Sequence, residues 1–263
     1  MTWAKGAIVR APGRPGRTLD DAKLFMAAAN AIAGERAVAL PAIPDPRHPS
    51  LDELKTIRHV VTTFTTRYPR NPLRTQNLRL AAGKLDGAVI PAGGTLSFNE
   101  TVGERTREAG YRDAVIFVEG RHEPGLAGGI CQVSTTMYNA ALLADLDVVR
   151  HSNHSLPVPY VPMGRDAAVY WGSKDLVIRN RFATPVALSA EIGGGRLTFR
   201  VLGPDPGDRK VDVIVSRRRF GKGGTTSVDT YRRVRQNGAT VRDEALGTST
   251  YRPPAPPLPT RTS

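Results

Sequence analysis

The chain has 263 residues, of which 37 are Lys or Arg and 24 are Asp or Glu, so it carries a formal net charge of +13. Hydrophobic residues make up 40% of the chain, which is enough to bury a core and excludes a disordered protein. No apolar run approaches the roughly 20 residues of a membrane helix, and a single cysteine excludes an internal disulfide. The positive charge predicts an anionic partner: a nucleic acid, a membrane surface or a cell-wall polymer.

The first 50 residues contain one predicted helix between two stretches rich in Pro and Gly. The helix runs from Asp20 to about Ala33, with Asp20 or Thr18 as its N-cap and apolar residues at helical spacing. The Pro-rich run 41–49 is typical of a linker. The first six residues lack the apolar stretch of a secretory signal. We therefore expect a small N-terminal segment, too short to be a complete domain.

Residues 51–203 predict a mixed domain. The best helix is 130–146, because it contains no Gly or Pro and places Ile130, Val133 and Met137 on one face. The other predicted elements are helices 51–61 and 77–85, strands 60–64 and 88–90, short strands and Gly turns over 91–129, and strands 148–149, 158–161, 167–171, 176–178, 186–192 and 197–202. This mixture predicts an α+β fold, mostly antiparallel β, with a central helix that starts at the segment around Cys131.

Residues 204–263 are more polar and more basic than the rest of the chain. Segments 211–215 and 227–231 predict a hairpin, and the Pro-rich run 253–257 predicts an extended end. The expected domain boundaries are therefore 1–50, 51–203 and 204–263.

Chemistry is concentrated around Cys131, the only cysteine, which follows two glycines at the start of the predicted helix. Free N–H groups and the helix dipole favour an anion there, so the pKa of the thiol should be lowered and its thiolate available as a nucleophile. The N–H groups around Gly129 and Cys131 can stabilise an oxyanion. The alternative is a lone cysteine that packs as a small buried hydrophobic residue.

A thiolate nucleophile needs a base, for which histidine is the usual residue. The pair His151 and His154 lies just after the helix and its first strand, whereas His122 lies in an expected loop. Either Asp166 or Asp175 can orient the imidazole, as in the helix-and-sheet arrangement of papain-type enzymes. The same Cys, His and Asp residues are competent zinc ligands, but structural zinc sites prefer paired cysteines. His48 and His59 are expected to be ordinary surface residues.

Several motifs, in the right order, resemble the VanW family. They are GGTLSFNETVG (93–103), GYRDA (110–114), GGICQVSTTMYNA (128–140), HS (154–155), YVP (160–162), GRDA (164–167) and KDL (174–176). The resemblance covers roughly 51–203. The segment that ends at Val38 to Pro41 resembles the tail of a peptidoglycan-binding module that often precedes this domain. Arg150 and His151 depart from the acidic-basic pair expected before the family histidine, so His151 stays a second candidate for the base.

The resemblance implies a bacterial, extracytoplasmic cell-wall enzyme, in a family found in some cases beside vancomycin-resistance genes. It implies L,D-transpeptidase-like acyl transfer on peptidoglycan stem peptides, through a thioester on Cys131 with His154 as the base and Asp166 orienting it. No metal or organic cofactor is implied, and the basic residues are expected to hold stem carboxylates or an anionic wall polymer. The residues expected to bind substrate are Gly128, Gly129, Gln132, Ser134, Asn99 and Arg165.

Two other classes of function stay open at this point. In a non-catalytic peptidoglycan-binding module, the same cleft would recognise a stem peptide while Cys131 only packs. Nucleic-acid binding would use the net positive charge, but no nucleic-acid motif occurs and the arginines are scattered through the chain.

Overall fold

A computed structural model describes residues 1–4, 6–9, 17–19, 21–32, 42–44, 49–118 and 121–253. At its centre is an antiparallel four-stranded sheet in the order β5-β13-β12-β6. Gly194 and Gly195 form the tight turn between β12 and β13, and both have a positive φ that suits glycine. The strands are β5 (His59–Arg67), β6 (Val89–Ile90), β12 (Val186–Gly193) and β13 (Arg196–Gly203).

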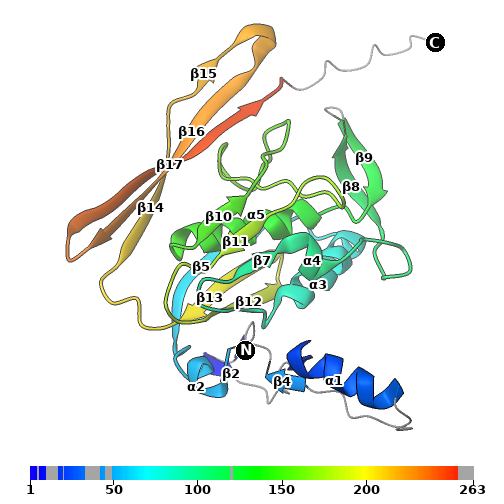
Figure 1. Ribbon diagram of the computed structural model, residues 1–263. Coiled ribbons are helices and arrows are strands. Elements are labelled where there is room, and N and C mark those ends of the chain that lie inside the picture. Colours follow the sequence, from blue (N-terminus) through cyan, green and yellow to red (C-terminus); the bar gives the residue numbers. More distant parts are fainter. Residues whose placement is uncertain are drawn as a thin grey trace.

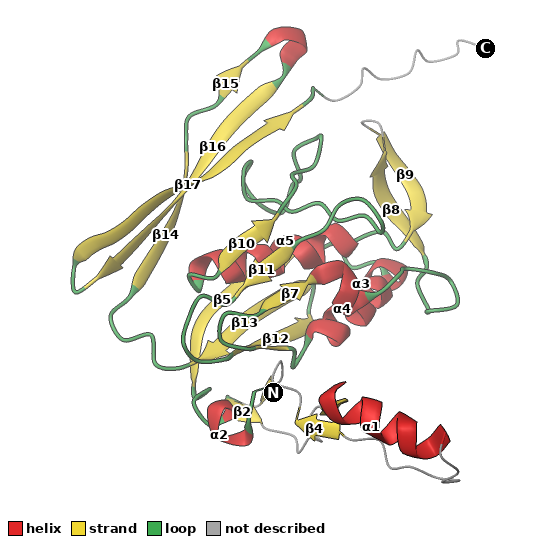
Figure 2. Cartoon of the chain, viewed as in Figure 1, coloured by secondary structure: helices red, strands yellow, loops and turns green. Residues whose placement is uncertain are grey.

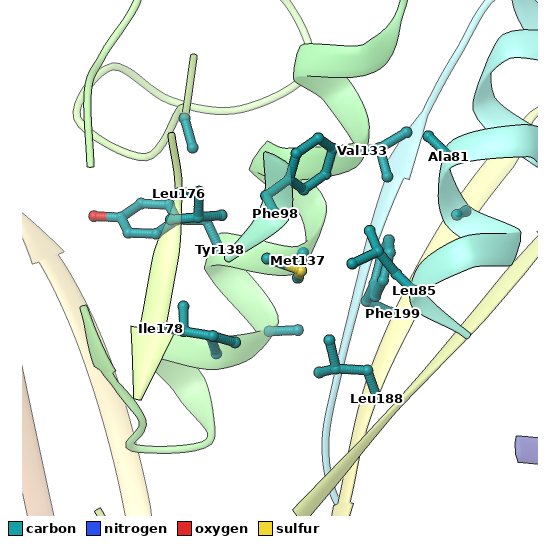
Figure 3. Packing of buried hydrophobic residues seen from close by; sticks show 14 of the residues in the cluster. Ala81, Leu85, Phe98, Val133, Met137, Tyr138, Leu176, Ile178, Leu188 and Phe199 are labelled. Atoms are coloured by element: carbon teal, nitrogen blue, oxygen red, sulfur yellow. The ribbon is translucent and has the colours of Figure 1, made fainter. Parts of the chain in front are cut away.

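Helix α5 (Ile130–Leu143) lies between this sheet and a smaller three-stranded antiparallel sheet. The smaller sheet has the order β10-β11-β7, with β10 (Asp147–Arg150), β11 (Val177–Arg179) and β7 (Thr95–Ser97). Figure 3 shows Met137 of α5 between Ile178 of β11 and Phe199 of β13, and all three side chains are fully buried. Because both sides of α5 are covered, almost every residue along it is buried, polar ones included.

Helix α3 (Pro72–Leu85) packs beside α5 on the same sheet, and its Ala81 and Leu85 enter the common core (Figure 3). Asn71 accepts a hydrogen bond from the N–H of Arg74, and Pro72 occupies the first turn, so both local signals for a helix start are present. The remaining elements of this region are α2 (Leu51–Leu54), α4 (Phe98–Val102), β8 (Asp113–Val118) and β9 (Arg121–Leu126).

The C-terminal residues form a separate antiparallel sheet of long strands that crosses the side of the molecule where α5 and β10 lie (Figure 1). β16 is its central strand, paired with β14, β15 and β17. The elements are β14 (Lys210–Val215), β15 (Arg219–Phe220), a short 3₁₀ turn (Lys222–Gly224), β16 (Thr226–Gln236) and β17 (Ala239–Tyr251).

The N-terminal elements lie on the opposite side of the central sheet from the C-terminal sheet (Figure 2). Hairpin β1 (Thr2–Ala4) and β2 (Ala7–Val9) adds Met1, Trp3 and Ile8 to a small apolar cluster around Ile57, Ala187 and Leu202. Strands β3 (Arg17–Leu19) and β4 (Ala42–Pro44) pair with each other, and α1 (Asp21–Ile32) lies between them in sequence.

The predicted α+β class with mostly antiparallel strands is confirmed, and helix α5 begins at Ile130, one residue before the cysteine. The helix predicted over 51–61 is wrong in length: it ends at Leu54, and β5 begins at His59. The short helix α4 was not predicted. The Pro-rich run 253–257 lies outside the described residues beyond Pro253.

The strands predicted at 158–161 and 167–171 are also wrong. In the second segment, the Ala168 N–H donates to the Ser152 oxygen, Tyr170 pairs with Lys174 in an isolated bridge, and the backbone of Ala167 bonds to side chains of α5. The Ala167 oxygen accepts hydrogen bonds from Ser134 and Thr135, and its N–H donates to Thr135. At Ala167, a hydroxyl-rich helix face therefore takes the place of a strand partner.

Candidate functional site

Cys131 is the second residue of α5 and is only partly buried. Its thiol donates to the main-chain oxygen of Val169 at 3.4 Å. Two glycines make this position possible. Gly129 caps the helix with φ +111°, and a Cβ on Gly128 would lie 2.5 Å from the Ala114 oxygen. The glycine pair therefore lets the helix start against the β8 backbone and against Arg74 and Leu78 of α3.

His154 lies between Cys131 and Asp166. Its Nδ1 is 2.6 Å from Oδ2 of Asp166, and its side chain also forms a hydrogen bond with the Cys131 sulfur. Because Nδ1 is engaged by the carboxylate, Nε2 is the nitrogen left for the sulfur. The main-chain N–H of His154 donates to the same Asp166 oxygen at 2.7 Å. The structure thus brings together a thiol, an imidazole and a carboxylate in the order of a catalytic triad.

The charges of this triad reinforce one another. Burial raises the pKa of the Cys131 thiol, but the hydrogen bond and positive charge of His154 outweigh it, so the pKa lies below its ordinary value. Burial lowers the pKa of His154, but its hydrogen bonds to Asp166 and Cys131 prevail and raise it to about 9. At neutral pH these directions favour a thiolate paired with an imidazolium, which is the nucleophilic state of a cysteine enzyme.

The first turn of α5 offers a donor for an oxyanion. The N–H of Ile130 donates to the Ala127 oxygen and that of Gln132 to the Gly129 oxygen. In the described part of the chain, the N–H of Cys131 has no backbone acceptor. A carbonyl oxygen bound against the sulfur can therefore accept from it, as expected for the N–H groups around Gly129 and Cys131.

Two arginines add positive charge near the sulfur. Arg105 lies over the Trp171 ring at 5.9 Å and donates to Oδ1 of Asn99 at 2.8 Å. Arg74 donates to Oε1 of Gln132, the neighbour of Cys131, at 2.8 Å. Burial lowers the pKa of each guanidinium, and the charge of the Cys131 thiolate partly offsets this. The two cations favour an anionic ligand at this end of α5.

His151, the second candidate for the base, has different partners. Its Nε2 is 2.7 Å from the main-chain oxygen of Asp166, and its ring stacks on Tyr138 at 4.4 Å between centroids. Burial lowers the pKa of His151, so it is neutral where His154 is charged. His151 therefore supports the Asp166 backbone, and His154 is the imidazole in contact with the sulfur.

Asp175, the alternative carboxylate, accepts hydrogen bonds from Ser97 and from the N–H groups of Asn99 and Leu176. It caps α4 instead of orienting a histidine. The backbone of His122 pairs with Phe117 in the β8-β9 hairpin, His59 is an exposed residue of β5, and His48 lies outside the described residues.

The polar residues expected to bind substrate have intramolecular partners. Gln132 bonds to Thr66, the Arg67 oxygen and Arg74, and Ser134 donates to the Ala167 oxygen. Asn99 holds the loop after β10 through the Tyr170 and Lys174 oxygens. Arg165 donates to Asn139 and stacks over Phe64. Their contact with a substrate stays a prediction, whereas their observed bonds fix the walls of the site.

Sequence reasoning missed three groups at the site. Arg105 and Arg74 stand out in no motif, and their proximity to Cys131 depends on the tertiary fold. Tyr251 lies 85 residues from Asp166 in sequence, yet its hydroxyl donates to that carboxylate. No local pattern signals such a contact.

In the described ranges, no cluster of three or more His, Cys, Asp or Glu side chains is arranged to hold a metal ion. Nor does any described helix have the length and apolar character needed to cross a membrane.

Comparison with known proteins places this site in a family. The chain is 37% identical over 163 residues to the uncharacterized protein YoaR of Bacillus subtilis (strain 168), covering 60% of this chain and 54% of that protein. It is 32% identical over 124 residues to the vancomycin B-type resistance protein VanW of Enterococcus faecalis (strain ATCC 700802 / V583), covering 45% of this chain and 44% of the relative. The chain thus spans about half the length of these curated relatives.

No solved structure matches the chain. Residues 73–202 match the family described as VanW like protein, and this range includes Cys131, His154 and Asp166. Residues 73–202 of the chain therefore form a VanW-like domain.

Proposed function

We propose that this protein is a cell-wall enzyme that transfers acyl groups between peptidoglycan stem peptides through a thioester on Cys131. The observation that carries the proposal is the hydrogen-bonded order of Cys131, His154 and Asp166 at a partly exposed helix start. The relative named as a vancomycin B-type resistance protein supports a role connected with the cell wall. We place the activity outside the cytoplasm, where peptidoglycan lies.

The reaction begins when the Cys131 thiolate attacks the carbonyl carbon of the third residue of a tetrapeptide stem. A C–S bond forms, and the oxyanion accepts a hydrogen bond from the Cys131 N–H. The C–N bond to the terminal D-alanine then breaks, and the leaving nitrogen takes the proton from His154. The products of this step are a thioester and free D-alanine.

An amine from a neighbouring stem resolves the thioester. Its nitrogen attacks the thioester carbon and gives a proton back to His154, and the C–S bond breaks to restore the thiolate. The new amide is a cross-link. With water as the acceptor, the same steps give a free carboxylate, and the enzyme acts as a carboxypeptidase.

The positive charges of Arg105 and Arg74 complement the negative charge of the terminal carboxylate of this substrate. A tetrapeptide stem ends in a carboxylate one residue beyond the attacked carbonyl, and guanidinium groups bind carboxylates in two-pronged hydrogen bonds. Asn99 and Gln132, which receive hydrogen bonds from these arginines, position the two cations.

The test uses disaccharide-tetrapeptide and mass spectrometry. Wild-type protein should release D-alanine and form a Cys131 acyl adduct, whereas Cys131→Ala should do neither. Because His154 must be protonated to release the amine, activity should fall as the pH rises through about 9. If wild type and Cys131→Ala gave the same D-alanine release and adduct signal, the proposed catalytic activity would be wrong. Muropeptide binding that survives in Cys131→Ala would then support a non-catalytic binding module.

A further inference from the structure

We infer that Tyr251, the last residue of β17, is a positioning residue for the triad, an inference that deepens the proposed function and rests on it. Tyr251 is 1% exposed, and its hydroxyl donates to Oδ1 of Asp166 at 2.5 Å. His154 takes the other oxygen, Oδ2. Tyr251 and His154 therefore each hold one oxygen of the Asp166 carboxylate, which fixes the rotation of the carboxylate.

The orientation of the Tyr251 hydroxyl is fixed as well. The N–H of Gly164 donates to Oη at 2.6 Å, which leaves the hydroxyl proton to point at Asp166. Burial and the negative charge of Asp166 raise the pKa of Tyr251, so the hydroxyl keeps its proton and stays a donor. Among the described residues, Tyr251 is the one side chain that donates to Oδ1 of Asp166.

The C-terminal sheet is anchored on both sides of the segment that carries the imidazole and the carboxylate. Asn153 donates to the Thr250 oxygen at 3.0 Å, and the Arg252 N–H donates to the Ser155 oxygen at 2.7 Å, so both neighbours of His154 are held. Thr230 of β16 donates to the Gly164 oxygen at 2.9 Å. The sheet thus holds the chain on both sides of His154 and at Gly164, two residues before Asp166.

The other groups around Asp166 do not replace this contact. His151 contacts its main-chain oxygen, and burial lowers the pKa of that imidazole. Burial raises the pKa of Tyr138 and of Tyr160, so both phenols are neutral. His154 is the charged neighbour of the carboxylate, and Tyr251 keeps that carboxylate facing it.

The test compares Tyr251→Phe with Tyr231→Phe in the full chain. Tyr231 lies on β16 of the same sheet and is 38% exposed, so it controls for the loss of a phenol there. The rate of Cys131 alkylation by iodoacetamide is measured against pH, which requires no peptidoglycan substrate. Without the Tyr251 hydroxyl, Asp166 holds His154 less firmly and the thiolate loses part of its stabilisation. The alkylation midpoint should rise by about 0.5–1 pH unit in Tyr251→Phe and stay at the wild-type value in Tyr231→Phe.

A second readout is turnover. For D-alanine release, kcat should fall about tenfold in Tyr251→Phe while KM changes less than about twofold, because Tyr251 does not touch the substrate. A folded Tyr251→Phe protein with the wild-type midpoint overturns the inference. If Tyr251→Phe does not fold, Thr230→Val serves in its place, because it removes the hydrogen bond to the Gly164 oxygen, and it must raise the alkylation midpoint. A folded Thr230→Val protein with the wild-type midpoint then overturns the inference.

The two readouts separate this inference from the proposed function. If the alkylation midpoints differ as expected while wild type releases no D-alanine, Tyr251 positions the triad and the proposed substrate is wrong. If wild type releases D-alanine and the alkylation midpoints of wild type and Tyr251→Phe coincide, the proposed enzymatic activity is supported and the proposed role of Tyr251 is wrong.

Discussion

The two segments that flank the family domain at 73–202 contact it in different ways. The N-terminal residues pack mainly apolar side chains, such as Trp3 and Ile8, around Ala187 of β12 and Leu202 of β13 in the central sheet. The C-terminal sheet also packs Val213 and Leu246 against the core, but it adds hydrogen bonds and ion pairs, among them those of Tyr251 and Arg232. Apolar packing adds stability without direction, whereas polar contacts fix the orientation of specific atoms. The hydrogen-bond network around Asp166 therefore extends beyond the C-terminal boundary of the family match.

The sharpest test of this comparison is Asp166→Asn, because Asp166 accepts hydrogen bonds both from His154 of the family domain and from Tyr251 of the C-terminal sheet. An amide presents one oxygen where a carboxylate presents two, so one of these donors loses its acceptor and the His154 proton loses its counter-charge. D-alanine release should fall by about 10³–10⁴-fold.

Asp175→Asn is the matched control, since Asp175 is the other carboxylate near the site but bonds to Ser97 and to main-chain N–H groups. Its turnover should stay within about tenfold of wild type. Equal losses in the two variants would show that the assay reports general damage to the site.

The next largest effect is expected for Arg232→Met, on the free energy of unfolding. Arg232 is 1% exposed, donates to the Leu146 oxygen beyond the C-terminus of α5 at 2.5 Å and pairs with Glu244 at 2.6 Å. Removing it takes the donor from the buried Leu146 oxygen and one of several arginine partners from Asp145, which should cost about 3 kcal/mol. Urea unfolding measures the change.

Arg233→Met is its neighbour on the other face of β16, where Arg233 pairs with Asp243 and both side chains are 44% exposed. An exposed pair contributes little, so the change should stay below about 1 kcal/mol. Similar losses in both variants would mean that the C-terminal sheet is not held to the domain through Arg232.

Gly164→Ala disturbs the same junction by volume instead of charge. Gly164 has φ +82°, and a Cβ there would lie 2.5 Å from Oγ1 of Thr230. The strain and the clash together should reduce the free energy of unfolding by about 2 kcal/mol and slow Cys131 alkylation. Gly207→Ala is the control, because it has φ +59° and open space around the added Cβ. It should cost about 1 kcal/mol and leave the alkylation rate unchanged.

The sequence predicts well what depends on local patterns. Uninterrupted apolar spacing predicts a helix over 130–146, of which α5 covers 130–143. The two glycines before it indicate a helix start where Cys131 is accessible. The motif order also identifies the histidine at 154 and the aspartate at 166 as a candidate pair. The structure adds that His154, and not His151, contacts the sulfur, because Asp166 bonds to the Nδ1 of one ring and offers only its main-chain oxygen to the other.

The features that the sequence does not reveal depend on contacts between distant segments. The segment 167–171 has the composition of a strand, but Ser134 and Thr135 on α5 bond to the backbone of Ala167, and the Ala168 N–H donates to the Ser152 oxygen. Arg105 is held at the site by the Phe98 and Trp171 rings and by its hydrogen bond to Asn99. Neither contact leaves a periodic signal in the chain.

The smallest expected effect belongs to the N-terminal flank, and Trp3→Ala measures it. The Trp3 ring is partly buried and lies 6.0 Å from the Arg200 guanidinium, and its main-chain N–H donates to Ser189, a bond that Ala retains. Losing the ring should therefore cost only about 1 kcal/mol of unfolding free energy. Because these contacts lie on β12 and β13 and none involves Asp166, the pH midpoint of Cys131 alkylation should match that of wild type. A shift as large as that of Tyr251→Phe would show that both flanking segments position the triad. The type of contact, apolar or polar, would then not predict which segment positions it.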